Sequence, residues 1–493
     1  MSKKLNHLAV RLVAVAALGL ALGHAEAKTK PNVLFIFADD QCYETVANLG
    51  HTDIDTPNLD RLAKRGTQFT RAYNMGSWSG AVCVASRHML ITGRHIWRAQ
   101  KAQQVLRGGK KLTDAQKAAR DAEFNNLWPQ VMGRAGYQTF FTGKWHISAA
   151  ADKAFQVARN IRGGMPNQTP QGYNRPLPDK PDPWSPYDIN FDGFWKGGKH
   201  WSEVVADDAV DYFGEATQDK RPFFMYIAFN APHDPRQAPK EYIDRYPLSR
   251  IKVPASYLDE YPYKDNIGCS ARLRDEKLGP FPRTHHAVKV HRQEYYAIIE
   301  HMDTQIGRIL DALEKSSQAD NTYIFFSADH GLGVGHHGLF GKQNLYEHST
   351  RVPFIAAGPG IKGGEKIAAP IYLQDVMATS LDIAEAKRPK QVEFQSLIPL
   401  LNGKKKESEV KAVYGAYLGL QRSVTVSNWK LILYPKISKA RLYNIKRDPL
   451  EINDQAADES KAKIVKRLYK RLLRLQKEHA DTLDLKAAFP KLG

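Results

Sequence analysis

The sequence alternates short apolar runs with amphipathic helical patterns along most of its length. The apolar runs lie at residues 33–37, 137–141, 223–227, 323–326 and 353–355. Helical patterns lie between them at residues 57–64, 127–134, 204–213 and 293–315. Because this alternation is typical of helices that cover a parallel sheet, we predict an α/β sandwich around a mostly parallel sheet.

Polar clusters follow four of the apolar runs. They are Asp39-Asp40, Lys144 with His146, His233-Asp234, and Asp329-His330. In open α/β sheets, ligands bind beyond the carboxyl ends of the strands. The four clusters therefore predict a single active site at that edge of the sheet.

The pattern changes near residue 407. Strand-like runs follow at residues 424–434 and 441–445, and residues 460–477 place leucines on one helical face with Lys and Arg on the other. A chain of 493 residues exceeds the size of one ordinary core, so more than one unit is expected. We predict a catalytic domain at residues 28–406 and a smaller C-terminal α+β subdomain at 407–493. Long polar insertions at 100–125, 160–200 and 255–290 are expected to be loops.

The first 27 residues have the pattern of a signal peptide. Lys3, Lys4 and Arg11 precede an apolar run from Leu12 to Leu22, and small residues follow at 25 and 27. The run is too short for a spanning helix, and no cysteine follows the expected cleavage site. We predict an exported protein, periplasmic or secreted, without a membrane anchor.

The formal net charge is +19, which favours a polyanionic partner. Nucleic acid, an anionic membrane and an acidic polymer all satisfy this condition. Export and the lack of a recognisable nucleic-acid-binding module disfavour nucleic acid. The chain has only three cysteines, Cys42, Cys83 and Cys269, so a disulfide framework is not expected, and at least one cysteine is predicted to serve chemistry.

The segment Cys83-Val84-Ala85-Ser86-Arg87, followed by Thr92-Gly93-Arg94, resembles the signature of formylglycine-dependent (type I) sulfatases. Further matching segments occur in the family's order along the chain: Asp39-Asp40, residues 143–146, residues 231–233, residues 329–331, Lys342 before Tyr346-Glu347, residues 442–444, and Asp448-Pro449. The resemblance implies the sandwich fold of the alkaline-phosphatase superfamily. The Asp329-His330 pair is similar to that of iduronate-2-sulfatase-like enzymes and bacterial carbohydrate sulfatases.

The resemblance implies one divalent metal ion. Asp39, Asp40 and Asp329 supply the hard carboxylate oxygens that calcium prefers. The family pattern adds His330 and the formylglycine made from Cys83. Because imidazole is an unusual calcium ligand, magnesium and manganese remain alternatives to calcium.

The resemblance also implies the catalytic roles. Formylglycine at position 83, in its hydrated form, is the nucleophile. Arg87 and His146 hold and deprotonate it, Lys144 and Lys342 bind the sulfate, and His233 protonates the leaving alcohol. Conversion of Cys83 requires a formylglycine-generating enzyme or an anaerobic sulfatase-maturating enzyme, and Ala85, where proline is commoner, leaves the choice between them open.

The predicted reaction is hydrolysis of a sulfate ester on a saccharide derived from a sulfated polysaccharide. The alternative within hydrolases is a phosphonate monoester or phosphodiester hydrolase that uses the same formylglycine. A catalytically silent carbohydrate-binding protein would have lost at least one of these residues, and none is missing.

Overall fold

A computed structural model describes residues 30–49, 53–164 and 169–492. Residues from Pro31 onward form one compact unit. The predicted signal peptide, residues 1–27, lies outside the described residues. No helix in the described ranges combines the length and the apolar character that crossing a membrane requires.

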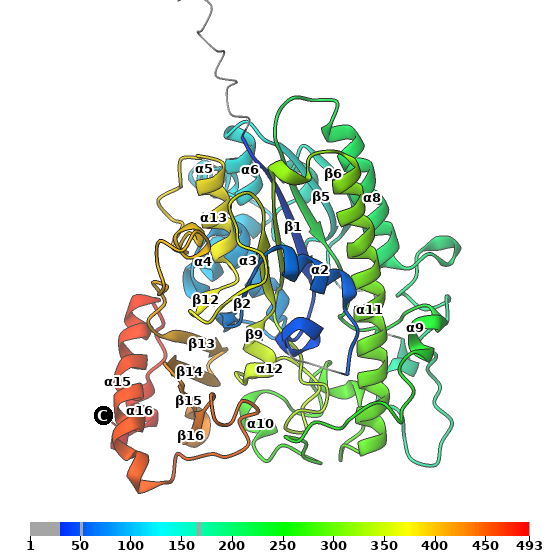
Figure 1. The fold of residues 1–493 in the computed structure, drawn as a ribbon. Coiled ribbons are helices and arrows are strands. Elements are labelled where there is room, and N and C mark those ends of the chain that lie inside the picture. The colour runs from blue at the N-terminus through cyan, green and yellow to red at the C-terminus, as the bar shows by residue number, and fades with distance from the viewer. Residues whose placement is uncertain (1–29, 50–52, 165–168, 493) are drawn as a thin grey trace, which may run out of the picture. The chain divides into compact units, whose positions relative to one another are not determined.

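An eight-stranded sheet forms the centre of the molecule (Figure 1). Its strands, in spatial order, are β11 (Glu365–Ile367), β2 (Thr67–Phe69), β10 (Phe354–Ala357), β8 (Thr322–Ala328), β1 (Asn32–Ala38), β7 (Phe223–Ala228), β5 (Gln138–Lys144) and β6 (Val157–Arg162). Five neighbouring strands, from β8 to β6, are parallel, whereas β10 runs antiparallel to both of its neighbours. The predicted mostly parallel sheet is confirmed.

Helices lie in two groups on either side of this sheet (Figure 1). One group contains α2 (Pro57–Arg65), α8 (Trp201–Ala216), α9 (Lys240–Asp244) and α11 (His285–Lys315). The other contains α3 (Val82–Thr92), α4 (Ile96–Arg107), α5 (Asp114–Asn125), α6 (Trp128–Arg134) and α13 (Asp375–Ile383). Four of these parallel strands, β8, β1, β7 and β5, are buried on both faces or nearly so, which explains why the apolar runs in them are continuous rather than alternating. The edge strand β6 is only partly buried.

Two segments differ from the sequence-based expectation. Residues 100–125 form most of α4 and all of α5 rather than a loop, because Thr113 and Gln116 make a reciprocal capping box at the start of α5. Helix α11 begins at His285, eight residues before the predicted start at 293. There the Thr284 side chain accepts a hydrogen bond from the backbone N–H of Ala287 and caps the helix.

The C-terminal part forms a β-rich subdomain, as predicted. Its sheet has the order β16 (Lys439–Asn444), β15 (Trp429–Tyr434), β14 (Gln421–Val426), β13 (Val413–Tyr417) and β4 (Gly76–Ser77). Strand β4 comes from the N-terminal third of the chain and pairs with β13 in parallel. The boundary between residues 406 and 407 therefore stays a prediction, since the two parts share this sheet. A third, small sheet contains β12 (Ile371–Tyr372), β3 (Ala72–Tyr73) and β9 (Arg351–Val352).

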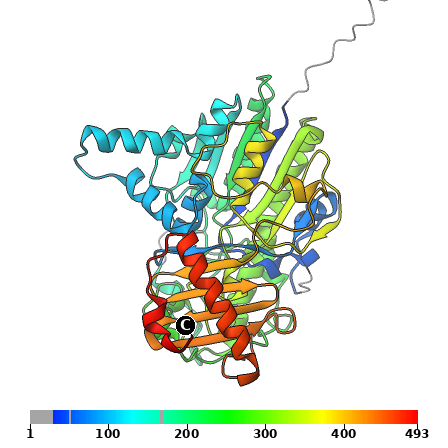
Figure 2. The same ribbon diagram turned by 90° about the vertical axis from the view of Figure 1, so that its left-hand side faces the viewer.

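The C-terminal sheet has a different neighbour on each face. Leu431 and Leu433 share a core with Leu468 of α15 (Ala462–Glu478). Their neighbours in β15, Ile432 and Tyr434, instead pack with a second apolar cluster that includes the loop residues 339, 345 and 346. Helix α15 crosses the outer face of the sheet (Figure 2). The sheet thus separates α15 from the loop that carries Lys342.

Gly143 precedes Lys144 at the end of β5, and it allows β5 to approach β7 closely. Its φ angle is 94°, and a Cβ atom added there would lie 1.8 Å from the carbonyl oxygen of Ala228. Gly136 has a similar φ of 93° but open space around it.

We expect Gly143→Ala to destabilise the protein by about 2 kcal/mol more than Gly136→Ala, because only the first adds a steric clash to the same left-handed strain. Denaturant unfolding of both variants measures the difference. Equal losses of stability would show that β5 can move away from β7 without cost.

Candidate active site

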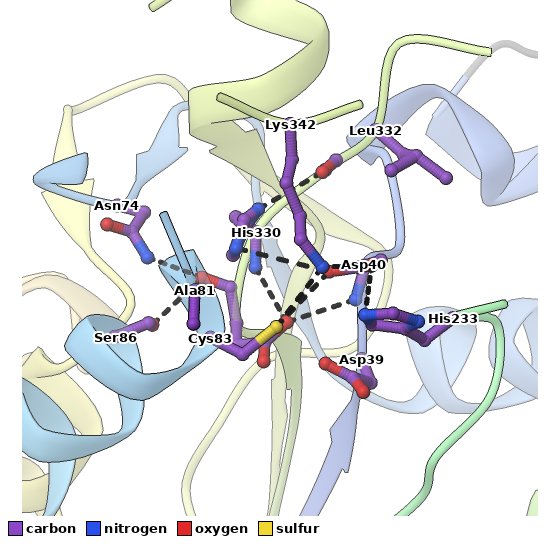
Figure 3. Close-up of polar contacts among 12 residues, drawn as sticks. Asp39, Asp40, Asn74, Ala81, Cys83, Ser86, His233, His330, Leu332 and Lys342 are labelled. Atoms are coloured by element: carbon purple, nitrogen blue, oxygen red, sulfur yellow. Dashed lines mark hydrogen bonds and ion pairs between the residues drawn. The ribbon is translucent and has the colours of Figure 1, made fainter. Parts of the chain in front are cut away.

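The four polar clusters predicted to converge lie together at the carboxyl edge of the central sheet. Asp39-Asp40 follow β1, Asp329-His330 follow β8, Lys144 ends β5, and His233 lies in the loop after β7. Figure 3 shows Asp39, Asp40, His233 and His330 close together. All three carboxylates are fully buried, with 0% of Asp39, Asp40 and Asp329 exposed. The sequence-based inference of a single site at this edge is consistent with this placement.

Helix α3 brings Cys83 and Arg87 to the same place. The Sγ atom of Cys83 lies 3.6 Å from Oδ1 of Asp40 and 3.3 Å from Nζ of Lys342. One turn further along α3, Arg87 donates from Nε to Oδ2 of Asp329 at 3.0 Å and from Nη1 to the carbonyl oxygen of Lys144 at 2.7 Å. Arg87 therefore connects the ends of β8 and β5 to the helix that carries Cys83.

Four side chains could hold a metal ion between them. Ligand atoms of Asp40, Cys83, Asp329 and His330 lie within 4.8 Å of one another. Oδ1 of Asp39 and Nε2 of His330 are buried without a hydrogen-bond partner among the described residues. Nδ1 of His330 lies 3.1 Å from the carbonyl oxygen of Gly331, so it carries the proton and leaves a lone pair on Nε2. This donor set fits a divalent cation.

Cations surround the carboxylates. Lys144 pairs with Oδ2 of Asp39, and Nζ of Lys342 lies 2.5 Å from Oδ2 of Asp40. Burial acts to raise the pKa of Asp39, but the charges of Lys144, His233 and Arg87 outweigh it and hold that pKa well below its ordinary value. Burial likewise acts to lower the pKa of Lys342, yet Asp40 and its neighbours raise it well above the ordinary value. Asp39 therefore carries its negative charge and Lys342 its positive charge in this site.

The thiol of Cys83 is protonated in this environment. Burial is the main cause that raises its pKa well above the ordinary value, and the negative charges of Asp329 and Asp39 add to it. Because the thiolate is the nucleophilic form of cysteine, the unmodified side chain would be a weak nucleophile here.

His233 lies between two carboxylates. Its Nε2 atom is 3.3 Å from Oδ2 of Asp40, and its Nδ1 atom is 2.9 Å from Oδ1 of Asp234. Asp234 in turn forms an ion pair with Arg274. A carboxylate on one ring nitrogen fixes the orientation of the ring and leaves the other nitrogen for proton transfer.

His146 lies beside the site without a hydrogen bond at Nδ1 among the described residues. Its backbone is left-handed, with φ at 55°. Burial, followed by the charges of Lys144 and Arg87, lowers its pKa to about 3, so the imidazole is neutral near pH 7. It is placed by the same strand as Lys144 but has no direct contact with Cys83 among the hydrogen bonds of the described residues.

Sequence reasoning missed the supporting roles of three residues, although it had already placed Asp234 in the polar cluster with His233. Asp275 accepts a hydrogen bond from Gln343 at 2.8 Å and lies 3.8 Å from Nζ of Lys342, and Arg274 and Asp234 form the pair behind His233. The role of Asp234 could have been found, because it follows His233 directly. Nothing in the local pattern marks Arg274 and Asp275, which lie in the long insertion at 255–290.

Cys42 and Tyr295 link the loop after β1 to the loop after β8 and to α11. The Tyr295 hydroxyl donates to the carbonyl oxygen of Asp40 at 2.6 Å and accepts from the backbone N–H of Cys42 at 3.0 Å. The Cys42 sulfur accepts from the N–H of Leu332 at 3.1 Å and lies 2.9 Å from its carbonyl oxygen. Burial raises the pKa of this thiol to about 12, which keeps it protonated. Asp40 itself has a φ of 69°, a strained conformation that these bonds stabilise.

The buried carboxylates and cations could hold a metal ion and an anionic group, and comparison with known families gives the class. Residues 31–386 match the family model described as Sulfatase, which covers more than half of the chain. Residues 335–478 match the model described as N-sulphoglucosamine sulphohydrolase, C-terminal. The chain belongs to the sulfatase family and is a sulfuric ester hydrolase.

Two relatives extend along most of the chain. A protein named Sulfatase from Formosa agariphila is 29% identical over 457 residues, which cover 88% of this chain and 85% of the relative. An N-acetylglucosamine-6-O-sulfatase from Bacteroides thetaiotaomicron is 26% identical, over 95% of this chain and 91% of the relative.

Two solved structures have a similar fold. One is a protein in complex with its substrate D-glucosamine-2-N,6-O-disulfate, with a TM-score of 0.70 and 22% identity over 93% of this chain and 100% of that chain. The other is a phosphonate monoester hydrolase of Agrobacterium radiobacter, also with a TM-score of 0.70, with 21% identity over 91% of this chain and 96% of that chain.

We expect Tyr295→Phe to lower the unfolding free energy by about 1–3 kcal/mol, because it leaves the Asp40 carbonyl and the Cys42 N–H buried without a partner. It should also weaken binding of a divalent metal about tenfold or more, since Asp40 loses its support. Calorimetric titration with calcium measures the second effect. Tyr212→Phe, which removes a buried bond to the Phe141 carbonyl far from Asp40, is the matched control and should change stability alone.

Proposed function

We propose that this protein is an exported carbohydrate sulfatase whose residue 83 is converted to formylglycine and whose carboxylates hold a divalent metal ion. The observation that carries the proposal is the position of Cys83: its sulfur lies between Asp40 and Lys342, within a buried set of metal ligands and cations. A sulfate ester resists nucleophilic attack because its oxygens are negatively charged. Cations placed around the sulfate group of the substrate reduce that repulsion.

Formylglycine at position 83 would supply the nucleophile, because its hydrate carries two hydroxyls on one carbon. The protonated state of the Cys83 thiol supports the need for this modification. Arg87 lies on the same helix and orients residue 83, and His146, whose Nδ1 has no hydrogen-bond partner among the described residues, is the proposed proton acceptor.

Lys144 and Lys342 are the sulfate-binding cations of the proposal. Each is fully or almost fully buried and each is paired with a metal-binding aspartate, so its ammonium group is held in place before the substrate arrives. His233, oriented by Asp234, donates a proton to the departing alcohol oxygen.

Asp39, Asp40, Asp329, His330 and residue 83 would hold the metal ion. It would neutralise charge on the sulfate oxygens. Three carboxylates favour calcium, while the nitrogen ligand from His330 keeps magnesium and manganese as alternatives.

Two observations support a sulfated saccharide as substrate. The relative from Bacteroides thetaiotaomicron is named for a sulfate ester on an amino sugar. The net charge of +19 also suits an acidic polymer. Export to the periplasm or the medium, where such polymers are found, rests on the signal-peptide pattern of residues 1–27.

The runner-up is hydrolysis of a phosphonate monoester. The fold of the Agrobacterium radiobacter hydrolase is as similar to this chain as that of the sugar-bound structure. A cationic site with a metal ion and a formylglycine stabilises a phosphonate as well as a sulfate.

The first test is release of inorganic sulfate by the mature protein, made in a host that installs formylglycine. The panel contains sulfated mono- and oligosaccharides, an aryl sulfate and a phosphonate monoester. We expect release from a saccharide sulfate that Cys83→Ala and prior removal of metal by a chelator both abolish. Cleavage of the phosphonate with silence on every sulfate, in protein whose formylglycine is verified by mass spectrometry, would instead establish the runner-up.

The general-acid role of His233 predicts a dependence on the leaving group. We expect His233→Gln to lower kcat/KM about 100-fold or more for a saccharide sulfate, whose alkoxide leaving group needs a proton. For a nitrophenyl sulfate, whose leaving group is stable as an anion, the loss should be less than about tenfold. His479→Gln, which replaces another buried histidine outside the site, is the control. Equal losses on both substrates would assign His233 to binding instead.

A further inference from the structure

A stripe of cations occupies the solvent-facing side of α15. Six of the seven cationic residues of α15 lie at spacings of one, three or four residues within twelve positions: Lys463, Lys466, Arg467, Lys470, Arg471 and Arg474. At about 1.5 Å per residue the stripe is about 16 Å long. The opposite side of the helix, which includes Leu468 and Leu472, is buried against the C-terminal sheet.

The stripe is not neutralised by its surroundings. In the described part of the chain, Arg471 alone among the six has a carboxylate partner, Glu478 at 2.8 Å. Other exposed lysines of this protein do have carboxylate partners four residues away, as in Lys240 with Asp244 and Lys405 with Glu409. Like charges at these spacings destabilise a helix by about 0.2–0.5 kcal/mol per pair. The repulsion within the stripe therefore opposes folding, and binding of an external anion would relieve it.

The same residues form the walls of a groove. A hollow of about 500 Å³ is lined by all six cations, and Val426 at the end of β14 is its partly exposed apolar residue. A concave surface of this composition has cations to contact sulfate groups and apolar atoms to contact the C–H faces of sugar rings. A membrane surface would be met better by a flat or convex face with protruding aromatic residues.

The groove is separate from the active site. Helix α15 lies on the outer face of the C-terminal sheet (Figure 2), whereas the loop that carries Lys342 packs against the other face through Leu345 and Tyr346. A molecule that occupies both places must extend around this sheet, so a single monosaccharide cannot reach both, but a polymer can.

We propose that the cationic groove on α15 is a second binding site for the sulfated polysaccharide, distinct from the site of hydrolysis. The groove binds the polysaccharide through sulfate groups that are not being cleaved. This binding raises the concentration of sulfate esters near residue 83. The inference rests on the proposed function for its choice of ligand, because charge complementarity alone would accept other polyanions.

The test uses the full mature chain with Cys83→Ala, so that binding is measured without turnover. The probe is fluorescent dextran sulfate, with unsulfated dextran as the neutral control. The variant Lys463→Gln, Lys466→Gln, Lys470→Gln changes three exposed residues and spares the apolar face of α15. The matched control is Lys153→Gln, Lys220→Gln, Lys315→Gln, which removes the same charge from exposed positions of the catalytic part.

We expect the α15 variant to bind dextran sulfate about tenfold more weakly at low salt, as three exposed ion pairs are lost. Its affinity should also depend less steeply on salt, because fewer counterions are released. The control variant should stay within about twofold of the parent. Equal weakening by both variants, or no weakening by either, would overturn the proposal. The proposal would also be overturned if duplex DNA or phosphatidylserine vesicles bound more tightly than dextran sulfate and if the α15 variant lost that binding.

Activity separates this proposal from the proposed function. In protein with formylglycine, the α15 variant should lower kcat/KM for a sulfated polysaccharide about as much as it lowers binding. It should leave kcat/KM for a monosaccharide sulfate unchanged. Loss on the monosaccharide as well would contradict a separate site. If no sulfate ester is hydrolysed at all, the proposed function fails, while the binding measurement still decides whether the groove holds a sulfated chain.

Discussion

The mutual repulsion of three buried carboxylates is the constraint on which the site depends. Asp39, Asp40 and Asp329 meet at one edge of the sheet with no exposed surface, and isolated charges in such a place are strongly unfavourable. Lys144, Lys342 and Arg87 balance them charge for charge. A divalent cation added to this arrangement would leave an excess of positive charge, which is the condition an anionic substrate requires. Removal of any one of the three cations would leave a buried charge unpaired.

The sequence predicted the residues of the candidate site better than the residues that hold them in place. Apolar runs and the polar residues after them located Asp39, Asp40, Lys144, Asp329 and His330, because in a parallel sheet position along the chain determines position at the edge. Cys83 and Arg87 lie on a helix and were found only through resemblance to a family. Tyr295 comes from the middle of α11 and bonds to Asp40, 255 positions away, while Asp275 comes from an insertion and bonds to Gln343, 68 positions away. No local pattern relates either residue to its partner.

Helices and strands that follow from the pattern of neighbouring residues were also predicted well. Features that depend on pairing with distant segments were not. The apolar face of α15 and the strands β14 to β16 follow from periodicity within a few residues. The reversed direction of β10 and the addition of β4 to the C-terminal sheet depend on tertiary pairing. That sheet matters for the site, since Tyr434 and Tyr443 pack under the loop that positions Lys342 and belong to the same hydroxyl network as Tyr261 and Tyr346.

The pairing of β4 with β13 has a consequence for the order of events during biosynthesis. Gly76 lies opposite Ala416, so the segment just before Cys83 cannot reach its final place until some 340 further residues have been made. At about 5–20 residues per second, this takes tens of seconds. In the folded protein Cys83 is only 2% exposed. The proposed conversion of Cys83 to formylglycine would therefore have a defined interval, between emergence of the Cys83 segment and completion of the C-terminal sheet.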